Sequence, residues 1–169
     1  MSGRKSLLIE PLTRDAFMPF GDTVDGTDLP TITINQGFAE RVNGLARVET
    51  AGHTGIVNVS LFVAHKRPQP IAIQMMERHP LGSQLFYPLQ DRDWLVVVCA
   101  DPREWQSYRA FRATGRQGVN YARNVWHHPL LVLADHERFF VVDRGDAAST
   151  PANNLEEIWL DEPDWLQLP

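Results

Sequence analysis

Apolar positions along this chain recur in short runs, many of them alternating with polar positions, and this is the pattern of β-strands. The runs "GIVNVSLFV" (55–63) and "WLVVVCA" (94–100) are rich in β-branched residues, and turn-forming residues separate such runs. The sequence predicts strands at 31–34, 45–49, 55–63, 71–76, 84–89, 94–100, 109–112, 130–134 and 138–142. Because long crossover helices are missing between these runs, an antiparallel sandwich or barrel is favoured over a parallel α/β sheet.

Helical spacing is short wherever it occurs. The segment "TRDAF" (13–17) predicts a short helix with Thr13 as its N-cap, and 104–108 and 155–159 predict single helical turns. No internal repeat, low-complexity segment or linker interrupts the chain, so we expect one domain over residues 1–169. The closing "DEPDWLQLP" is interpreted as an ordered strap or as a contact with a partner, and the pattern does not decide between them.

Composition narrows the class of protein. The chain has 169 residues, 43% of them hydrophobic, which is enough for one core. A net charge of −5 with scattered Lys and Arg argues against nucleic-acid binding. Without a long apolar window or a signal-peptide pattern, we expect a cytoplasmic protein with no membrane span. The single cysteine, Cys99, lies in an apolar run, which predicts a buried, unreactive thiol and no disulfide framework.

A first polar cluster, "ERHPLGSQLFYPL" (77–89), interrupts the strand pattern. On a strand, Glu77 and His79 share one face, and the turn-prone 80–82 predicts a hairpin that returns Gln84 to the same face. Glu and His are good ligands for borderline divalent metals, and Gln is a weaker oxygen donor. On its own, Glu-x-His more often marks a surface pair than a site.

A second polar cluster, "VNYARNVWHHPL" (119–130), contains turn formers and then a strand that begins at Trp126, which we interpret as a core residue. His127 and His128 point to opposite faces of an extended strand, so only one can face a barrel interior and the other lies outside or at an interface. The spacing does not say which.

Other polar side chains could each have either a structural role or a role in substrate binding. We interpret Ser60 as an ordinary strand hydroxyl, and Lys66 and Arg67 as part of a solvated loop. Arg112, Arg123 and Arg144 can each bind a carboxylate through a bidentate contact or form a surface ion pair.

The two clusters resemble the paired ligand motifs of cupin barrels. The usual cupin supplies two histidines and a glutamate from the first motif and one histidine from the second. In this chain the four positions are occupied by Glu77, His79, Gln84 and His127. Two of the four ligand types therefore differ from the usual set, since a glutamate replaces the first histidine and a glutamine replaces the glutamate.

More specifically, "MERHPLGSQLFYP" and "GVNYARNVWHHPL" are similar to the pattern of the ureidoglycolate lyase family. The similarity also takes in "AFMPFGDTV", "INQGFAERVNGLARVE" and "FVVDRG", and so covers residues 8–145. It implies an all-β, cupin-like antiparallel barrel of jelly-roll type with a few short helices. It also implies a homodimeric, cytoplasmic enzyme that splits ureidoglycolate, a small molecule from allantoin breakdown, into glyoxylate and urea. A divalent metal, nickel or zinc, is implied for some members, and no organic cofactor.

The resemblance and the residue chemistry together suggest roles. Glu77, His79 and His127 are predicted to be catalytic acids and bases, and with Gln84 they are the predicted ligands if a metal binds. The predicted substrate-binding residues are Gln84, Arg78, Arg112, Arg123 and Ser60. Alternatives left open are an ammonia-releasing ureidoglycolate amidohydrolase, another cupin enzyme such as an isomerase or dioxygenase, and a non-catalytic barrel that binds small molecules.

Overall fold

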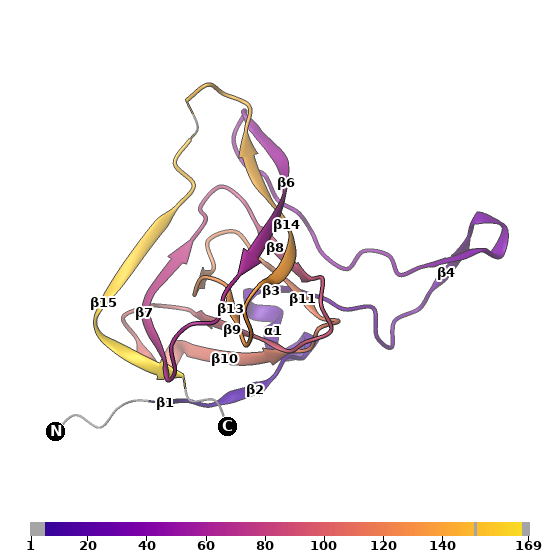
Figure 1. The fold of residues 1–169 in the computed structure, drawn as a ribbon. Coiled ribbons are helices and arrows are strands. Elements are labelled where there is room, and N and C mark those ends of the chain that lie inside the picture. Colours follow the sequence, from indigo (N-terminus) through magenta and orange to yellow (C-terminus); the bar gives the residue numbers. More distant parts are fainter. Residues whose placement is uncertain (1–5, 151, 167–169) are drawn as a thin grey trace.

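Two β-sheets wrap around a shared core in the computed structural model, which describes residues 6–150 and 152–166 (Figure 1). The first sheet runs in the order β1 (Ser6–Leu7), β15 (Glu156–Leu166), β7 (Ile71–Arg78), β12 (Trp126–His127), β9 (Trp94–Cys99), β10 (Tyr108–Ala113) and β2 (Ile9–Pro11), and β13 (Leu131–Val132) also pairs with β9. The second sheet runs in the order β3 (Gly21–Val24), β11 (Gly118–Tyr121), β8 (Gln84–Pro88), β14 (Glu137–Asp146) and β6 (Gly55–Ala64).

The strand pairs of both sheets are mostly antiparallel. Among the described strands, only β1 with β15 and β2 with β10 pair in parallel. The helices are single turns: α1 (Arg14–Phe17) and the 3-10 helices η1 (Met18–Phe20), η2 (Asn35–Gly37) and η3 (Trp105–Ser107). The prediction of an all-β, mostly antiparallel fold with a few short helices is confirmed. Within the described residues, no helix has the length and apolar character that crossing a membrane requires.

Strand β9 is buried on both faces, which explains its uninterrupted apolar sequence. Trp94 and Val96 face the cluster between the sheets, where the Trp94 ring meets Phe139 edge to face with a centroid distance of 4.9 Å. Leu95 and Cys99 face a second apolar cluster. Burial raises the pKa of the Cys99 thiol to about 12, so the predicted buried, unreactive thiol agrees with the structure.

Local predictions hold where a local interaction decides the structure. Thr13 caps α1, because its side-chain oxygen accepts a hydrogen bond from the Ala16 N–H at 3.2 Å. The turn predicted at 104–108 is η3. Three interpretations are wrong: 45–49 is irregular, 155–159 belongs mostly to β15, and the turn formers Gly118 and Asn120 lie within β11, whereas Asn124 does lie in a turn. In each case the structure of the segment is decided by whether it pairs with a distant strand, and not by its local sequence pattern.

A hairpin arm leaves the barrel between β3 and β6 (Figure 1). Its strands β4 (Ile32–Ile34) and β5 (Ala39–Arg41) pair with each other and, in the part of the chain that the structure describes, with no other strand. At its base, the Arg47 N–H donates to the Asp22 carboxylate at 3.0 Å. We call residues 27–46 the arm.

Candidate active site

Three side chains with metal-binding and proton-transferring groups converge where β7 and β12 pair. Glu77 and His127 lie directly opposite each other in the ladder, so they share a face, and His79 follows two residues after Glu77. One ligand atom from each of the three lies within 4.8 Å of the others. His127 Nε2 is 3.5 Å from Glu77 Oε1, and the two imidazole rings have a centroid distance of 5.3 Å. We call these residues the Glu-His-His cluster.

Backbone carbonyls orient both histidines of the cluster. His127 Nδ1 lies 2.9 Å from the Val125 carbonyl oxygen, and His79 Nδ1 lies 2.8 Å from the Asn154 carbonyl oxygen. In both rings we therefore assign the proton to Nδ1, which donates to the carbonyl. Each Nε2 keeps its lone pair, and both Nε2 atoms are buried without a hydrogen-bond partner. An imidazole held in this way is ready to bind a metal or to accept a proton.

Two further residues reach the cluster from the second sheet. The Tyr121 ring stacks on the His127 imidazole, with a centroid distance of 4.1 Å and an interplanar angle of 9°. Gln84 lies opposite Tyr121 in the β8–β11 pair, and its Oε1 is buried without a partner. Burial and the nearby Glu77 carboxylate raise the pKa of Tyr121, so its hydroxyl stays neutral.

The predicted hairpin at 80–82 is wrong in its geometry. Strands β7 and β8 lie in different sheets, so Gln84 approaches Glu77 across the barrel and not along one hairpin. Gly82 forms a bridge with Thr50, and a side chain there would collide with Arg144. The chain therefore crosses between the sheets at a position where only glycine fits.

The charge state of Glu77 suits a proton acceptor. Burial opposes ionisation of its carboxyl group, but contact with His127 and the neighbouring histidines outweighs this and holds the pKa of Glu77 below its ordinary value. The carboxylate is therefore ionised at neutral pH and faces two imidazoles.

His128, the neighbour of His127, is buried as well, with 2% of its surface exposed. The expectation that one of the two histidines lies outside is wrong, because β12 ends at His127 and the chain bends after it. The His128 Nδ1 lies 2.7 Å from the Pro129 carbonyl oxygen. Burial lowers the pKa of His128 to about 4, so its imidazole is neutral at physiological pH.

A cavity of about 370 Å³ opens beside the cluster. Its lining residues come from the end of β6, the loop that follows, the start of β8 and the segment after His128: Phe62, Val63, Ala64, His65, Arg67, Glu77, Gln84, Phe86, Pro129 and Leu130. Arg67 was missed, because we interpreted its pair with Lys66 as a solvated loop. Among the described residues Arg67 forms no ion pair with a carboxylate. No local sequence signal marks it, since its place depends on which strands close the barrel.

Arg78 points away from the cluster. It follows Glu77 on the strand and therefore faces the opposite side of the sheet. Its guanidinium carbon lies 4.5 Å from the centroid of the Trp126 ring, and its Nε–H donates to Glu156 at 2.7 Å. It lines a larger hollow of about 640 Å³ on that side, which contains none of the cluster residues.

The remaining predicted substrate-binding residues also lie elsewhere. Arg112 is 3.6 Å from Asp93, and the Ser60 hydroxyl accepts a hydrogen bond from Asn58 at 3.1 Å. Arg123 lines a separate hollow of about 320 Å³ beside residues 47–51. The structure brings Gln84, but none of these, to the cavity beside Glu77.

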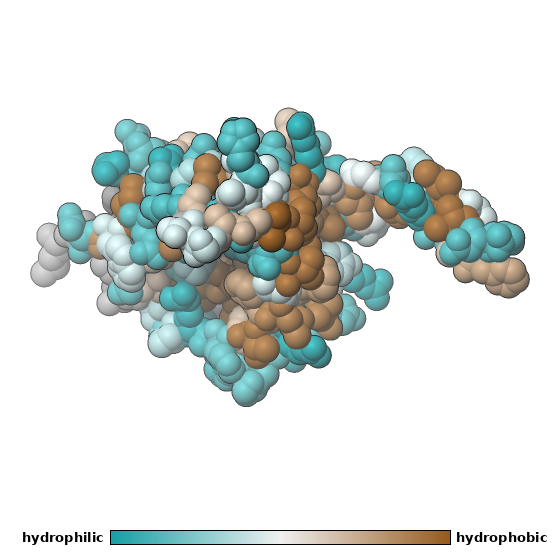
Figure 2. Space-filling model, turned by 90° about the horizontal axis from the view of Figure 1, so that it is seen from above, coloured by the Kyte–Doolittle hydropathy of each residue, from teal (hydrophilic) through white to brown (hydrophobic). Residues whose placement is uncertain are grey.

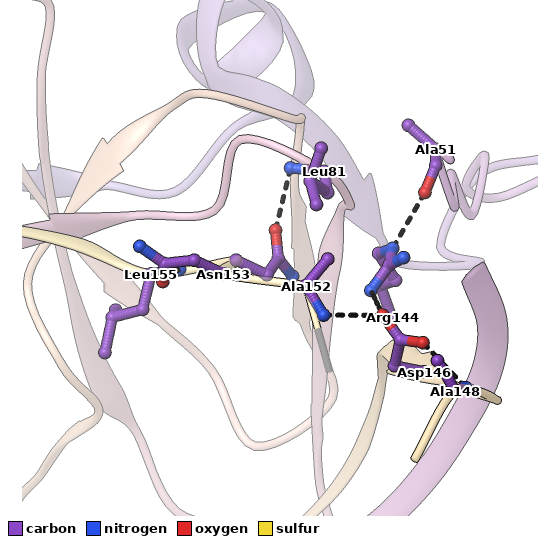
Figure 3. Close-up of polar contacts among 9 residues, drawn as sticks. Ala51, Leu81, Arg144, Asp146, Ala148, Ala152, Asn153 and Leu155 are labelled. Atoms are coloured by element: carbon purple, nitrogen blue, oxygen red, sulfur yellow. Dashed lines mark hydrogen bonds and ion pairs between the residues drawn. The ribbon is translucent and has the colours of Figure 1, made fainter. Parts of the chain in front are cut away.

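A buried ion pair holds the segment that precedes β15 (Figure 3). The Asp146 carboxylate accepts hydrogen bonds from the N–H groups of Ala148 and Ala152, both at 2.9 Å, and lies 3.1 Å from Arg144 Nη1. The Arg144 Nε–H donates to the Ala51 carbonyl at 2.8 Å. These contacts hold the pKa of Asp146 well below its usual range.

The same segment supports His79. The Asn154 side-chain oxygen accepts a hydrogen bond from the Leu81 N–H at 2.7 Å, while the Asn154 carbonyl faces the His79 ring. The Asp146 contacts therefore steady the residue that sets the orientation of His79.

The donor atoms of the site fit a divalent transition metal. Two imidazole nitrogens and a carboxylate form a mixed nitrogen and oxygen set, and Gln84 Oε1 adds an oxygen that has no other partner. Metal-binding histidines normally donate their other ring N–H to a fixed acceptor that orients the ring, and the Nδ1 contacts of both histidines with backbone carbonyls do this here. Glu77, His79 and His127 can therefore hold a metal, and this donor set does not distinguish nickel from zinc.

The sequence profile described as "Ureidoglycolate lyase" matches residues 4–167. The chain belongs to the ureidoglycolate lyase family. "Ureidoglycolate lyase 1" of Rhizobium meliloti (strain 1021) is 50% identical over 157 residues, which cover 92% of this chain and 90% of that protein. "Ureidoglycolate lyase" of Stutzerimonas stutzeri (strain A1501) is 45% identical over 166 residues, covering 97% and 95%.

Among solved structures, oxalate decarboxylase from Bacillus subtilis matches with a TM-score of 0.38 and 13% identity. The match covers 66% of this chain and 29% of that one, so this chain spans less than a third of its length.

Proposed function

We propose that this member of the ureidoglycolate lyase family cleaves ureidoglycolate into glyoxylate and urea, with the Glu-His-His cluster as its acid–base machinery. The observation that carries the proposal is the convergence of Glu77, His79 and His127 within 4.8 Å beside a cavity of about 370 Å³. Relatives at 45–50% identity that are named ureidoglycolate lyase support the same substrate.

The reaction moves one proton from oxygen to nitrogen. Ureidoglycolate carries a hydroxyl group and a urea nitrogen on one carbon, beside a carboxylate. The ionised Glu77 accepts the hydroxyl proton, so that the oxygen electron pair forms the aldehyde C=O while the C–N bond breaks. His127, whose Nε2 lies 3.5 Å from Glu77, relays this proton to the departing nitrogen. Urea leaves as a neutral molecule.

The substrate is held by groups that line the same cavity. Arg67 is the arginine that lines this cavity, and its guanidinium matches a carboxylate bidentately. We therefore assign it the carboxylate-binding role first expected of Arg78, Arg112 or Arg123. Gln84 Oε1 has no other partner and can accept a hydrogen bond from the urea N–H groups.

A bound metal would be held by the cluster residues with Gln84. It would lower the pKa of the substrate hydroxyl and favour its deprotonation. Nickel or zinc as its identity, the homodimer and the cytoplasmic location stay predictions from the family resemblance.

The decisive experiment incubates the purified protein with racemic ureidoglycolate, with and without chelator, and measures glyoxylate, urea and ammonia. A lyase gives glyoxylate and urea in equal amounts without ammonia. Ammonia release would indicate the amidohydrolase, and binding without turnover would indicate a non-catalytic barrel. Loss of activity with chelator that one metal restores would identify the cofactor.

Glu77→Gln and His127→Gln test the assigned roles. Each removes a proton-transferring group, so we expect kcat to fall by about 10²–10⁴. The exposed Glu104 and His53 supply matched controls, because Glu104→Gln and His53→Gln make the same changes away from the cavity. If either cluster variant keeps wild-type turnover, the role of that residue is wrong.

A further inference from the structure

Two histidines outside the Glu-His-His cluster lie next to each other at the end of the β6–β14 strand pair. The two strands pair in register up to Ala64 and Glu137, so His65 and His136 occupy the next opposed positions. Their imidazole rings have a centroid distance of 4.7 Å and an interplanar angle of 80°. Both residues are exposed, and neither takes part in the proposed reaction.

The ring nitrogens of this pair have few competing partners. Strand β6 exposes Leu61 and Val63 near its end, and Figure 2 shows hydrophobic residues gathered on the flank from which the arm projects. Apart from Asp135, no hydrogen-bonding or charged partner of either ring lies among residues 6–150 and 152–166. The nitrogens are therefore available to bind an ion.

Contacts of the backbone hold the two histidine segments together. Asp135 Oδ1 accepts a hydrogen bond from the Lys66 N–H at 3.1 Å and lies 3.8 Å from His65 Nδ1. A carboxylate beside one ring nitrogen is a common support of a metal-binding histidine. His136 has a φ of 61°, which is uncommon for a residue other than glycine and turns the chain into β14. The strand register, this hydrogen bond and the turn therefore bring the two rings together.

We propose that His65 and His136 bind a divalent transition metal such as Ni²⁺ or Zn²⁺, as a second site that shares no ligand with the Glu-His-His cluster. Imidazole is a good ligand for these metals. Two imidazoles that share one ion, with each nitrogen about 2 Å from it, have ring centroids about 5 Å apart. The 4.7 Å of this pair fits that spacing, as does the 5.3 Å of His79 and His127. Exposed side chains can rotate to direct one nitrogen of each ring at the ion, and water fills its remaining positions.

The histidine pair adjoins the active-site cavity. His65 is one of the residues that line the cavity beside Glu77, and Arg67 lines it two positions later in the chain. An ion held by His65 adds positive charge on the same side of the cavity as Arg67. Binding of the ion does not depend on which reaction the cluster performs, so it can be measured without substrate.

Titration of the chelator-treated full chain with Ni²⁺, followed by calorimetry, tests the site. His65→Gln and His136→Asn should each weaken one class of Ni²⁺ binding at least about tenfold, since losing even an outer-shell partner has an effect of this size. Asparagine tolerates the positive φ of His136, so the second variant keeps the turn. His53→Gln is the matched control, because it removes an exposed histidine elsewhere and should leave Ni²⁺ binding unchanged.

The same titration in a Glu77→Gln/His127→Gln double variant separates this site from the cluster. The double variant lacks two of the three cluster ligands but should still bind one Ni²⁺, and adding His65→Gln should remove that binding. Pulsed EPR of Cu²⁺ bound to the double variant should show two imidazole ligands. The proposal would be overturned if the double variant binds no metal, if His65→Gln and His136→Asn leave the binding unchanged, or if His53→Gln weakens it equally.

Discussion

The buried, neutral His128 should make the stability of the fold sensitive to acid. Its pKa is about 4 in the folded chain and 6.5 in a model peptide, so the unfolded chain binds more protons between these values. The stabilisation is complete above about pH 6.5 and is lost as the pH falls toward about 4. A difference of about 2.5 pKa units corresponds to about 3 kcal/mol, of which about 2 kcal/mol is lost between pH 7.5 and pH 5.

Urea unfolding of chelator-treated protein at these two pH values measures the effect. Other groups titrate as well, so the informative quantity is the difference in pH dependence between wild type and His128→Gln. The variant should lose about 2 kcal/mol less than wild type between pH 7.5 and pH 5. His53→Gln, which removes an exposed histidine, should follow wild type. Equal pH dependence of wild type and His128→Gln would show that His128 is not kept neutral by burial, and would refute the reasoning.

Two further variants address the site. Arg67→Gln removes a charged hydrogen bond to the substrate carboxylate, so it should raise KM for ureidoglycolate about 10- to 100-fold with a smaller effect on kcat. Steady-state kinetics measures this, with Lys66→Gln as the control, and an unchanged KM would exclude Arg67 as the carboxylate partner. Asp146→Asn should loosen the segment that orients His79 and weaken Ni²⁺ or Zn²⁺ binding, measured by calorimetry, by about tenfold. Asp91 is exposed, so Asp91→Asn should leave the metal affinity unchanged, and an unchanged metal affinity of Asp146→Asn would contradict its supporting role.

The parts of the fold that sequence predicted are those decided by neighbours along the chain. The β-branched run at 55–63 coincides with β6, and Thr13 caps the first helix as its side chain requires. The cluster of Glu77 with His127 was also accessible, because each lies in a recognisable polar motif within a strand pattern. Local chemistry therefore predicted most of the strands and the side chains that converge in the Glu-His-His cluster.

The errors concern contacts between distant segments. Gln84 lines the same cavity as Glu77, but it does not reach it through the predicted hairpin, since β7 and β8 join different sheets. The segment at 45–49 alternates like a strand, but it pairs with none of the described strands. Arg67 lies in an exposed loop, and only the closure of the barrel brings that loop beside Glu77. Pairing partners and barrel closure are not encoded in any short window of sequence.

The first sheet and the orientation of His79 can be completed only after strand β15 and the segment before it have been synthesised. Strand β15 lies between β1 and β7, and the carbonyl that orients His79 comes from Asn154, 75 residues later. When only about the first 140 residues have emerged from the ribosome, β15 has not yet been made. The edge of β7 that pairs with β15 is then free, and no Asn154 carbonyl orients His79. Such edges attract other chains, and contacts of long sequence separation form slowly. Truncation before residue 154 should consequently yield aggregation-prone chains instead of a smaller active barrel.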